Sequence, residues 1–256
     1  VDLARSAPPP VGRRPVVRPA GPSRRLALAA GVALMAGAGL FAWTQTPQPW
    51  RIETGPGEMR TVRLDDGSRV TLDGRTRLVL DRRRPREVEL MAGRALFDVA
   101  HDDTDPFRVQ VGDTALTDLG TVFDVTRLPD GTRVSVSEGR VEVAAAAGRA
   151  VLDPGDGVLV TARGMERRPV PIDAVDSWRE GRLTYAGEPL AVVAGDLARR
   201  LGHPVTVSDD LAGRRFTGSV RIGGAPDALR GRLSVLLGVA IVETGGGWRL
   251  EPPSPS

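Results

Sequence analysis

The sequence predicts a mainly β protein in which an all-β domain over residues 44–170 precedes a small α/β domain over residues 171–251. Three observations carry this prediction. Residues 51–170 alternate apolar and polar positions between Gly-containing turns, as half-buried strands do. The second domain instead contains two stretches with apolar residues at helical spacing. Ahead of both domains, residues 26–43 form an uncharged run that is long enough to cross a bilayer as one helix.

The first 25 residues are rich in Arg, Pro, Gly and Ala without a hydrophobic period, which is typical of a disordered segment. They carry six Arg and one Asp, a net charge of +5, whereas the rest of the chain carries −2. The basic excess therefore indicates membrane topology rather than nucleic-acid binding.

The uncharged run at residues 26–43 follows Arg24 and Arg25 and ends at Trp43. Basic residues on one flank and an interfacial aromatic ring on the other are typical of a membrane helix with its basic end in the cytoplasm. We therefore predict a single-pass membrane protein whose bulk lies outside the cytoplasm. Because the run is rich in Ala and Gly, two alternatives stay open: a cleaved export signal of twin-arginine type and a buried soluble helix.

Many short strands at roughly ten-residue spacing predict the β domain. Asp66-Gly67 and Asp130-Gly131 lie between alternating runs, where a tight turn needs positive φ. The predicted strands cover residues 59–64, 70–72, 78–80, 87–91, 95–99, 107–111, 122–126, 132–136, 141–143 and 158–161. This spacing fits both a solenoid of stacked hairpins and a sandwich.

The C-terminal domain is predicted to follow the order β-α-β-β-α-β-β. Its strands are expected at residues 183–185, 205–207, 215–222, 239–243 and 248–250, and its helices at 189–201 and 226–237. Gly202 and Gly238 are placed to end the two helices. Residues 252–256 are predicted to be a disordered tail.

Five patterns in the β domain occur in order over about 100 residues. They are Val62-x-Leu64-x-Asp66-Gly67-Ser68-x-Val70-x-Leu72, Val88-x-Leu90-x2-Gly93-x-Ala95-x-Phe97-x-Val99, Pro106-Phe107-x-Val109, Leu119-Gly120-Thr121-x-Phe123-x-Val125 and Val134-x-Val136-x2-Gly139-x-Val141-x-Val143. The ordered set resembles the FecR-type transmembrane regulators of sigma factors. The C-terminal order resembles the short secretin and TonB N-terminal (STN) module, and Trp178-x2-Gly181-x-Leu183 resembles the FecR-type lead-in to it.

The resemblance implies an inner-membrane protein with a periplasmic β domain. Such a protein relays a signal from a TonB-dependent outer-membrane receptor, expected here to serve iron or siderophore uptake, to an extracytoplasmic-function sigma factor. Regulated proteolysis near the span by periplasmic or intramembrane proteases is expected. Family members usually carry a helical anti-sigma domain before the span, whereas 25 residues precede it here. Direct sigma-factor binding is therefore expected only with a further N-terminal domain.

The resemblance also implies that the C-terminal module receives the signalling domain of the receptor, for which strand addition at a sheet edge is a suitable mode. The residues expected to contact this partner are Leu183, Tyr185, Phe216, Gly218, Leu233 and Leu236.

The sequence predicts no catalytic, cofactor or metal site. The absence of Cys and Lys excludes thiolate zinc sites, cysteine nucleophiles and lysine Schiff bases. The acidic stretch His101–Asp105 and the basic run Arg82–Arg86 are expected to be exposed turns, and His203 a loop residue. We therefore expect the protein not to be an enzyme. The alternative to a sigma-factor regulator is an exported structural or assembly module of the cell envelope without a sigma partner.

Overall fold

The computed structural model describes residue 35 and residues 48–118 and 120–253. The predicted span at 26–43 therefore lies outside the described residues except for Met35, which is helical and exposed. Arg24, Arg25 and Trp43 also lie outside them. Among the described residues, no helix has the length and apolar character needed to cross a membrane.

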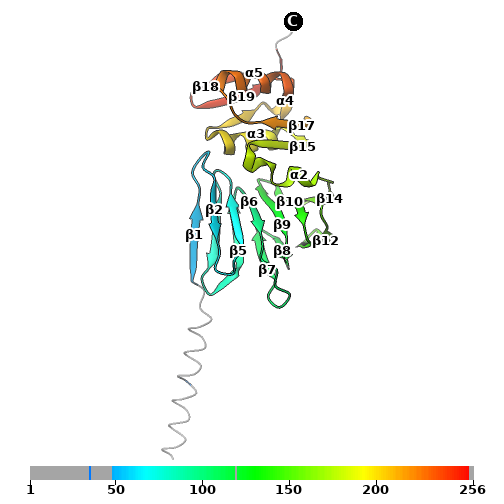
Figure 1. The fold of residues 1–256 in the computed structure, drawn as a ribbon. Helices are drawn as coiled ribbons and strands as arrows, with labels where there is room; N and C mark the ends of the chain where they lie inside the picture. The colour runs from blue at the N-terminus through cyan, green and yellow to red at the C-terminus, as the bar shows by residue number, and fades with distance from the viewer. Residues whose placement is uncertain (1–34, 36–47, 119, 254–256) are drawn as a thin grey trace, which may run out of the picture. The chain divides into compact units, whose positions relative to one another are not determined.

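Two seven-stranded sheets, which we name sheet A and sheet B, form a sandwich (Figure 1). Sheet A runs β1 (Pro49–Glu53), β4 (Arg77–Asp81), β5 (Arg84–Ala92), β7 (Phe107–Val111), β8 (Thr114–Asp118), β11 (Val141–Ala145) and β12 (Gly148–Leu152). Sheet B runs β14 (Gly164–Arg167), β13 (Gly157–Thr161), β10 (Gly131–Glu138), β9 (Val122–Leu128), β6 (Arg94–Asp98), β3 (Arg69–Leu72) and β2 (Arg60–Arg63). The predicted mainly β fold class is confirmed. Of the solenoid and the sandwich that the strand spacing left open, the structure has the sandwich.

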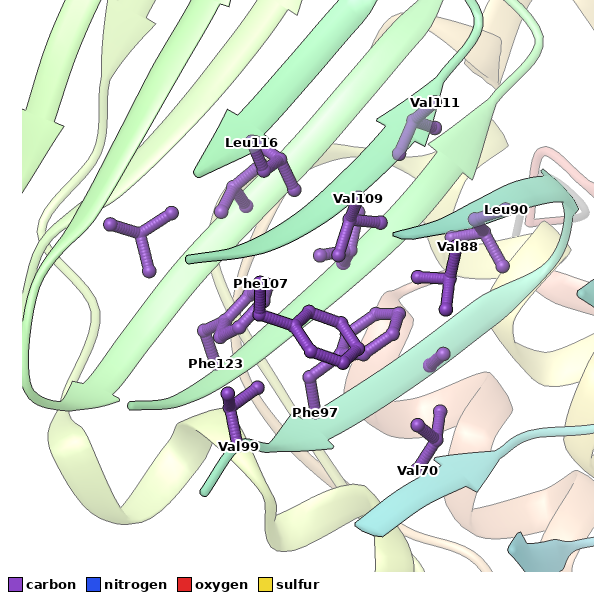
Figure 2. Packing of buried hydrophobic residues seen from close by; sticks show 14 of the residues in the cluster. Val70, Val88, Leu90, Phe97, Val99, Phe107, Val109, Val111, Leu116 and Phe123 are labelled. Atoms are coloured by element: carbon purple, nitrogen blue, oxygen red, sulfur yellow. The ribbon is translucent and has the colours of Figure 1, made fainter. Parts of the chain in front are cut away.

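The core of the sandwich lies where the inward side chains of the two sheets meet. Phe97 of β6 stacks on Phe123 of β9 with ring centroids 5.1 Å apart, and Phe107 of β7 lies 6.0 Å from Phe97 (Figure 2). All three rings are completely buried. Because Phe107 comes from sheet A and the other two from sheet B, this cluster joins the sheets at about the spacing that aromatic pairs prefer.

The predicted Asp-Gly hairpins are present between β2 and β3 and between β9 and β10. The turn at Gly139 has a different role, because β10 belongs to sheet B and β11 to sheet A. The chain crosses between the sheets there with φ of +73° at Gly139, and a Cβ atom would lie 2.4 Å from Cγ2 of Thr121. Only glycine fits this crossing without a shift of its neighbours.

The basic run Arg82–Arg86 is not entirely the exposed turn that the sequence predicted. Arg86 is 5% exposed and donates from Nη1 to Oδ2 of Asp66 at 2.7 Å. Its Nη2 donates to the carbonyl of Ala100 at 3.1 Å, and its guanidinium lies 5.6 Å from the Phe107 ring centroid. Arg86 is thus a structural residue that ties two loops to the edge of the core.

The C-terminal module contains α2 (Ile172–Val175), η1 (Ser177–Glu180), β15 (Arg182–Pro189), α3 (Leu190–Leu201), β16 (Val205–Val207), α4 (Asp209–Ala212), β17 (Arg215–Arg221), α5 (Pro226–Leu237), β18 (Ala240–Thr244) and β19 (Gly247–Glu251). The predicted order is present, with α2, η1 and α4 in addition. Strand β15 pairs with β17, and a second sheet has the order β16-β19-β18. Gly202 and Gly238 end α3 and α5 in the left-handed conformation, as predicted.

The module and the sandwich belong to one compact unit over residues 47–256. Leu96 of β6 is 3% exposed and joins the hydrophobic core of the module rather than that of the sandwich. The module therefore completes its own core on the outer face of sheet B.

Candidate functional site

The outer face of sheet B carries charged side chains that are nevertheless buried. In β6, Phe97 points into the sandwich while Arg94 and Leu96 point to the other face. In β9, Phe123 points inward and Asp124 points outward, and the register sets Asp124 directly opposite Leu96. Arg94 is 9% exposed and Asp124 is 2% exposed because the C-terminal module covers them. We call this contact between sheet B and the module the module interface.

Asp124 and Trp178 form the centre of the module interface. The indole Nε1 of Trp178 in η1 donates to Oδ2 of Asp124 at 2.8 Å. Nε of Arg94 donates to both carboxylate oxygens, at 3.0 and 2.9 Å, and its guanidinium lies 4.9 Å from the Trp178 ring centroid. Burial raises the pKa of Asp124, although Arg94 and Trp178 act in the opposite direction. The lead-in tryptophan is thus a docking residue of the module.

A second ion cluster lies on α3. Asp196 is 2% exposed and accepts from Nη2 of Arg133 on β10 at 3.2 Å. Arg199, one turn later on the helix, also pairs with Asp196. Burial by itself raises the pKa of Asp196, but the guanidiniums of Arg133 and Arg199 outweigh it, so the pKa lies below its ordinary value. The charge of Asp196 is therefore a link between α3 and sheet B.

The C-terminal end of α3 rests on two loops of the sandwich. The amide of Gly57 donates to the carbonyl of Arg199 at 3.0 Å, and Arg200 donates to Oδ1 of Asp73 at 3.2 Å. A Cβ atom on Gly74 would lie 2.2 Å from the carbonyl oxygen of Arg199. Close backbone approach explains the glycine at position 74.

The module interface is not fully satisfied by hydrogen bonds. Among the described residues, four buried polar atoms there have no hydrogen-bond partner: Oδ2 of Asp73, Nε of Arg199, Nε of Arg200 and the hydroxyl of Tyr185. The Tyr185 side chain borders a cavity of about 40 Å³ that is also lined by Arg94, Asp124 and Asp196. A buried charge network with incomplete partners stabilises little, because desolvation offsets much of the attraction.

The predicted partner-contact residues fall into two groups. Leu183, Tyr185 and Leu233 are at most 3% exposed, so their side chains form the module core and are not accessible to a partner in this conformation. Phe216 and Gly218 are half-buried on β17, and Leu236 is 46% exposed on α5. The helical and strand periods predict which residues face apolar surroundings, but they do not distinguish the core from a docking face.

Exposed apolar residues besides Leu236 lie on α5 and on the strand that follows it. Val235 on α5 is 86% exposed, and Val242 on the adjacent strand β18 is 43% exposed. Arg230 of α5 pairs with Glu243 of β18, which joins the two elements. Strand β18 is at the edge of its sheet, with β19 as its neighbour. We call this area the α5–β18 surface.

The acidic stretch around His101 is exposed, with Nε2 of His101 3.4 Å from Oδ1 of Asp103. His203 lies edge-on to Trp248 with ring centroids 4.8 Å apart. Across the part of the chain that the structure describes, no group of three or more His, Asp or Glu side chains is arranged to hold a metal ion.

Sequence reasoning missed Asp124, Arg133 and Asp196 as interface residues. The signal present was a charged residue at the outward position of a strongly apolar strand, or beside the apolar stripe of a helix. The same signal marks an ordinary solvated face, so only the covering module distinguishes the two.

The family comparison matches residues 50–142 to the family described as FecR protein. We call this matched segment the FecR domain. It takes in strands β1 to β10 and the start of β11, so the match ends inside the sandwich and before the module interface is complete.

Two crystal structures of a candidate anti-sigma factor from Parabacteroides distasonis ATCC 8503, at 2.50 and 1.65 Å resolution, share the fold. Their TM-scores are 0.71 and 0.72, with sequence identities of 22% and 23%. The alignments cover 81% and 80% of this chain and all of each solved chain. The likeness therefore extends beyond the FecR domain into the C-terminal module. A search of curated proteins found no match.

Proposed function

We propose that this protein regulates an extracytoplasmic-function sigma factor and relays a signal from a TonB-dependent outer-membrane receptor, as part of iron or siderophore uptake. The FecR domain is the observation that carries the proposal. The shared fold of the Parabacteroides distasonis candidate anti-sigma factor supports it. The C-terminal module has the STN-like order of elements and would receive the receptor's signalling domain.

We place the receptor contact on the α5–β18 surface. Val235, Leu236 and Val242 supply exposed apolar area, and single-sided pairing of β18 leaves backbone groups for strand addition. The core residues Leu183, Tyr185 and Leu233 are buried, so we do not assign them to the contact.

The module interface provides a route for the signal. A partner that binds the module in one arrangement relative to the sandwich shifts the population toward that arrangement. The buried charges of the interface contribute little net stability, so a modest binding energy suffices for the shift. Rearrangement of the module would then expose the chain near the span to regulated proteolysis.

The decisive experiment is binding of the full chain, in detergent or nanodiscs, to the signalling domain of the TonB-dependent receptor encoded nearby. We expect Leu236→Glu and Val242→Glu to weaken binding at least about tenfold, because each buries a charge in the contact. Val151→Glu is the matched control, since Val151 is 45% exposed on β12 of the sandwich. Absence of binding of the wild-type chain at tens of micromolar would remove the receptor from the proposal.

We further propose an inner-membrane location with the N-terminus in the cytoplasm and residues after Trp43 in the periplasm, following the charge asymmetry around residues 26–43. Alkaline phosphatase fused after residue 256 should be active, and the same enzyme fused in place of residues 26–256 should be inactive. Recovery of a chain that has been cleaved within residues 26–43 would favour the cleaved signal.

We propose no enzymatic activity. The opposing class, an envelope assembly module without a sigma partner, makes a different prediction in cells. Deletion of the gene would leave sigma-dependent transcription unchanged in that case, whereas the proposed regulator alters it. A hydrolase screen of the full chain, with His101→Ala as reference, tests the enzymatic class.

A further inference from the structure

A groove of about 920 Å³ lies between sheet B and α3, away from the α5–β18 surface. Its floor is the outer face of β10 and β13, with Leu159 half-buried. One wall is made by the β9–β10 and β13–β14 turns, and the other by Ala191, Val192 and Gly195 of α3. Because Ala191 and Gly195 have little or no side chain, this wall projects only slightly into the groove.

The charges around the groove are mainly positive. Five arginines and two acids line it: Arg133, Arg163, Arg168, Arg199 and Arg215 against Asp130 and Glu166. Asp196 compensates Arg133 and Arg199, and Glu166 pairs with Arg168 at 2.8 Å. Within the described part of the chain, Arg163 and Arg215 have no carboxylate at ion-pair distance, although both are exposed. Arg215 instead donates to the carbonyl of Gly187 at 2.8 Å.

The two arginines lie on opposite sides of the groove. Arg163 is in the turn between β13 and β14, and Arg215 begins β17 in the module. The field of Arg215 reaches across to β14, where it helps Arg168 to lower the pKa of Glu166. Apolar side chains of Leu128, Leu159 and Val192 line the groove between two guanidiniums that have no carboxylate partner. This arrangement suits a chain segment that carries carboxylates on both sides of apolar residues.

We propose that this groove binds an acidic linear segment of the protein partner, a proposal that rests on the proposed function because it assigns that partner a second contact. The N-terminal segment of the chain itself is excluded by charge, since residues 1–25 carry +5 and the groove is positive. The groove spans the sandwich and the module, so one bound segment bridges both.

Occupation of the groove is coupled to the module interface through shared residues. Arg133 and Arg199 line the groove and also hold Asp196. A carboxylate bound between them competes with Asp196 for the same guanidiniums and weakens the link between α3 and sheet B. The acidic segment therefore acts on the contact that keeps the module in place.

Direct binding tests the groove. The probe is a fluorescein-labelled nonapeptide with Glu and Leu in alternation, compared with the same peptide carrying Lys for every Glu, by fluorescence anisotropy with the full chain. We expect only the acidic peptide to bind, and the double variant Arg163→Glu/Arg215→Glu to weaken it about tenfold or more. Arg60→Glu is the matched control, because Arg60 is exposed on β2 at the opposite edge of sheet B.

A steric variant gives an independent readout. A Cβ atom on Gly195 would have only Nη1 of Arg199 nearby, at 3.9 Å. Gly195→Leu therefore adds its Cβ without a clash, places apolar volume at the groove wall and favours the helix. Thermal unfolding confirms that each variant is folded. Equal affinity for both peptides, or acidic-peptide binding that survives both the charge and the steric variants, would overturn the groove.

Binding of the receptor signalling domain distinguishes a failure of the groove proposal from a failure of the proposed function. Receptor binding that Leu236→Glu weakens and the groove variants leave unchanged would overturn the groove but keep the function. Groove-dependent binding of the acidic peptide by a chain that binds no receptor domain would keep the groove as an acidic-peptide site and overturn the partner assignment.

Discussion

The inner face of sheet B packs Phe97 and Phe123 against sheet A, whereas its outer face presents Arg94 and Asp124 to the C-terminal module. Both faces are buried, and the same two strands supply both sets of side chains. The inner contact is non-directional and grows with apolar area, while the outer contact depends on oriented hydrogen bonds between charges.

This difference assigns different tasks to the two faces. The apolar face gains free energy from every buried carbon and separates only when the sandwich unfolds. At the charged face, the attraction between charges is largely offset by the desolvation of Arg94 and Asp124 on sheet B and of Asp196 on α3. The net contribution to stability is therefore small, while the geometry is specific. The proposed relay requires one contact that stays closed and one that can change, and sheet B carries both.

The largest expected effect is in the sandwich core. Phe97→Ala removes a ring that stacks on Phe123, and we expect the free energy of unfolding to fall by about 3–5 kcal/mol. Urea denaturation followed by circular dichroism measures it. Met91→Ala on the same domain, where Met91 is 40% exposed, should leave the urea midpoint unchanged. Similar losses in both variants would contradict the assignment of the core.

The module interface should respond next. Asp196→Asn leaves the partly buried Arg133 and Arg199 without their carboxylate, and we expect a loss of about 2–3 kcal/mol at neutral pH. Hydrogen exchange should rise in α3 more than in β6 or β9. Glu142→Gln, which breaks an exposed pair with Arg149, is the control and should change neither measurement. Uniform exchange across the whole chain would mean that module and sandwich open together.

The backbone contact at the end of α3 gives a smaller effect. Gly74→Ala pushes a methyl group against the Arg199 carbonyl, and we expect about 1–3 kcal/mol of destabilisation. Gly213→Ala is the matched control, since a Cβ atom there meets nothing within 4 Å and φ is −85°. Thermal unfolding compares the two. A stable Gly74→Ala variant would show that the α3 end moves away from the sandwich at little cost.

The smallest effect concerns pH, and the two aspartates act in opposite directions. Because the pKa of Asp196 lies below 3.8, its contribution to stability is complete above that pH and is lost on acidification through the folded pKa. The raised pKa of Asp124 gives a contribution that is complete below 3.8 and is lost as pH rises through the folded value. We therefore compare the free energy of unfolding of the wild type and the two variants between pH 3 and 7. Asp196→Asn should remove the decrease in stability on acidification, and Asp124→Asn should remove the decrease in stability as the pH rises. Identical pH profiles for both variants would contradict these directions.

Local patterns predicted much of the fold. The period of two located β6 and β9, and the helical spacing located α3 and α5 with their glycine ends. Strands β1, β8, β12 and β14 were missed, since short segments with polar or small residues become strands only through their neighbours. Arg86 was assigned to an exposed turn because its burial depends on Asp66 and Phe107, which lie elsewhere in the sequence.

The sequence by itself determined the mainly β class, the order of elements in the C-terminal module and the resemblance to FecR-type proteins, because periods of two and 3.6 residues and glycine turns are local properties. The tertiary structure alone decided which charged residues are buried. Asp124 and Trp178 are 54 residues apart in the chain, and no period relates them. Their contact exists because the module completes its core on Leu96. The module therefore buries a strand face whose sequence pattern is that of a solvent-exposed face.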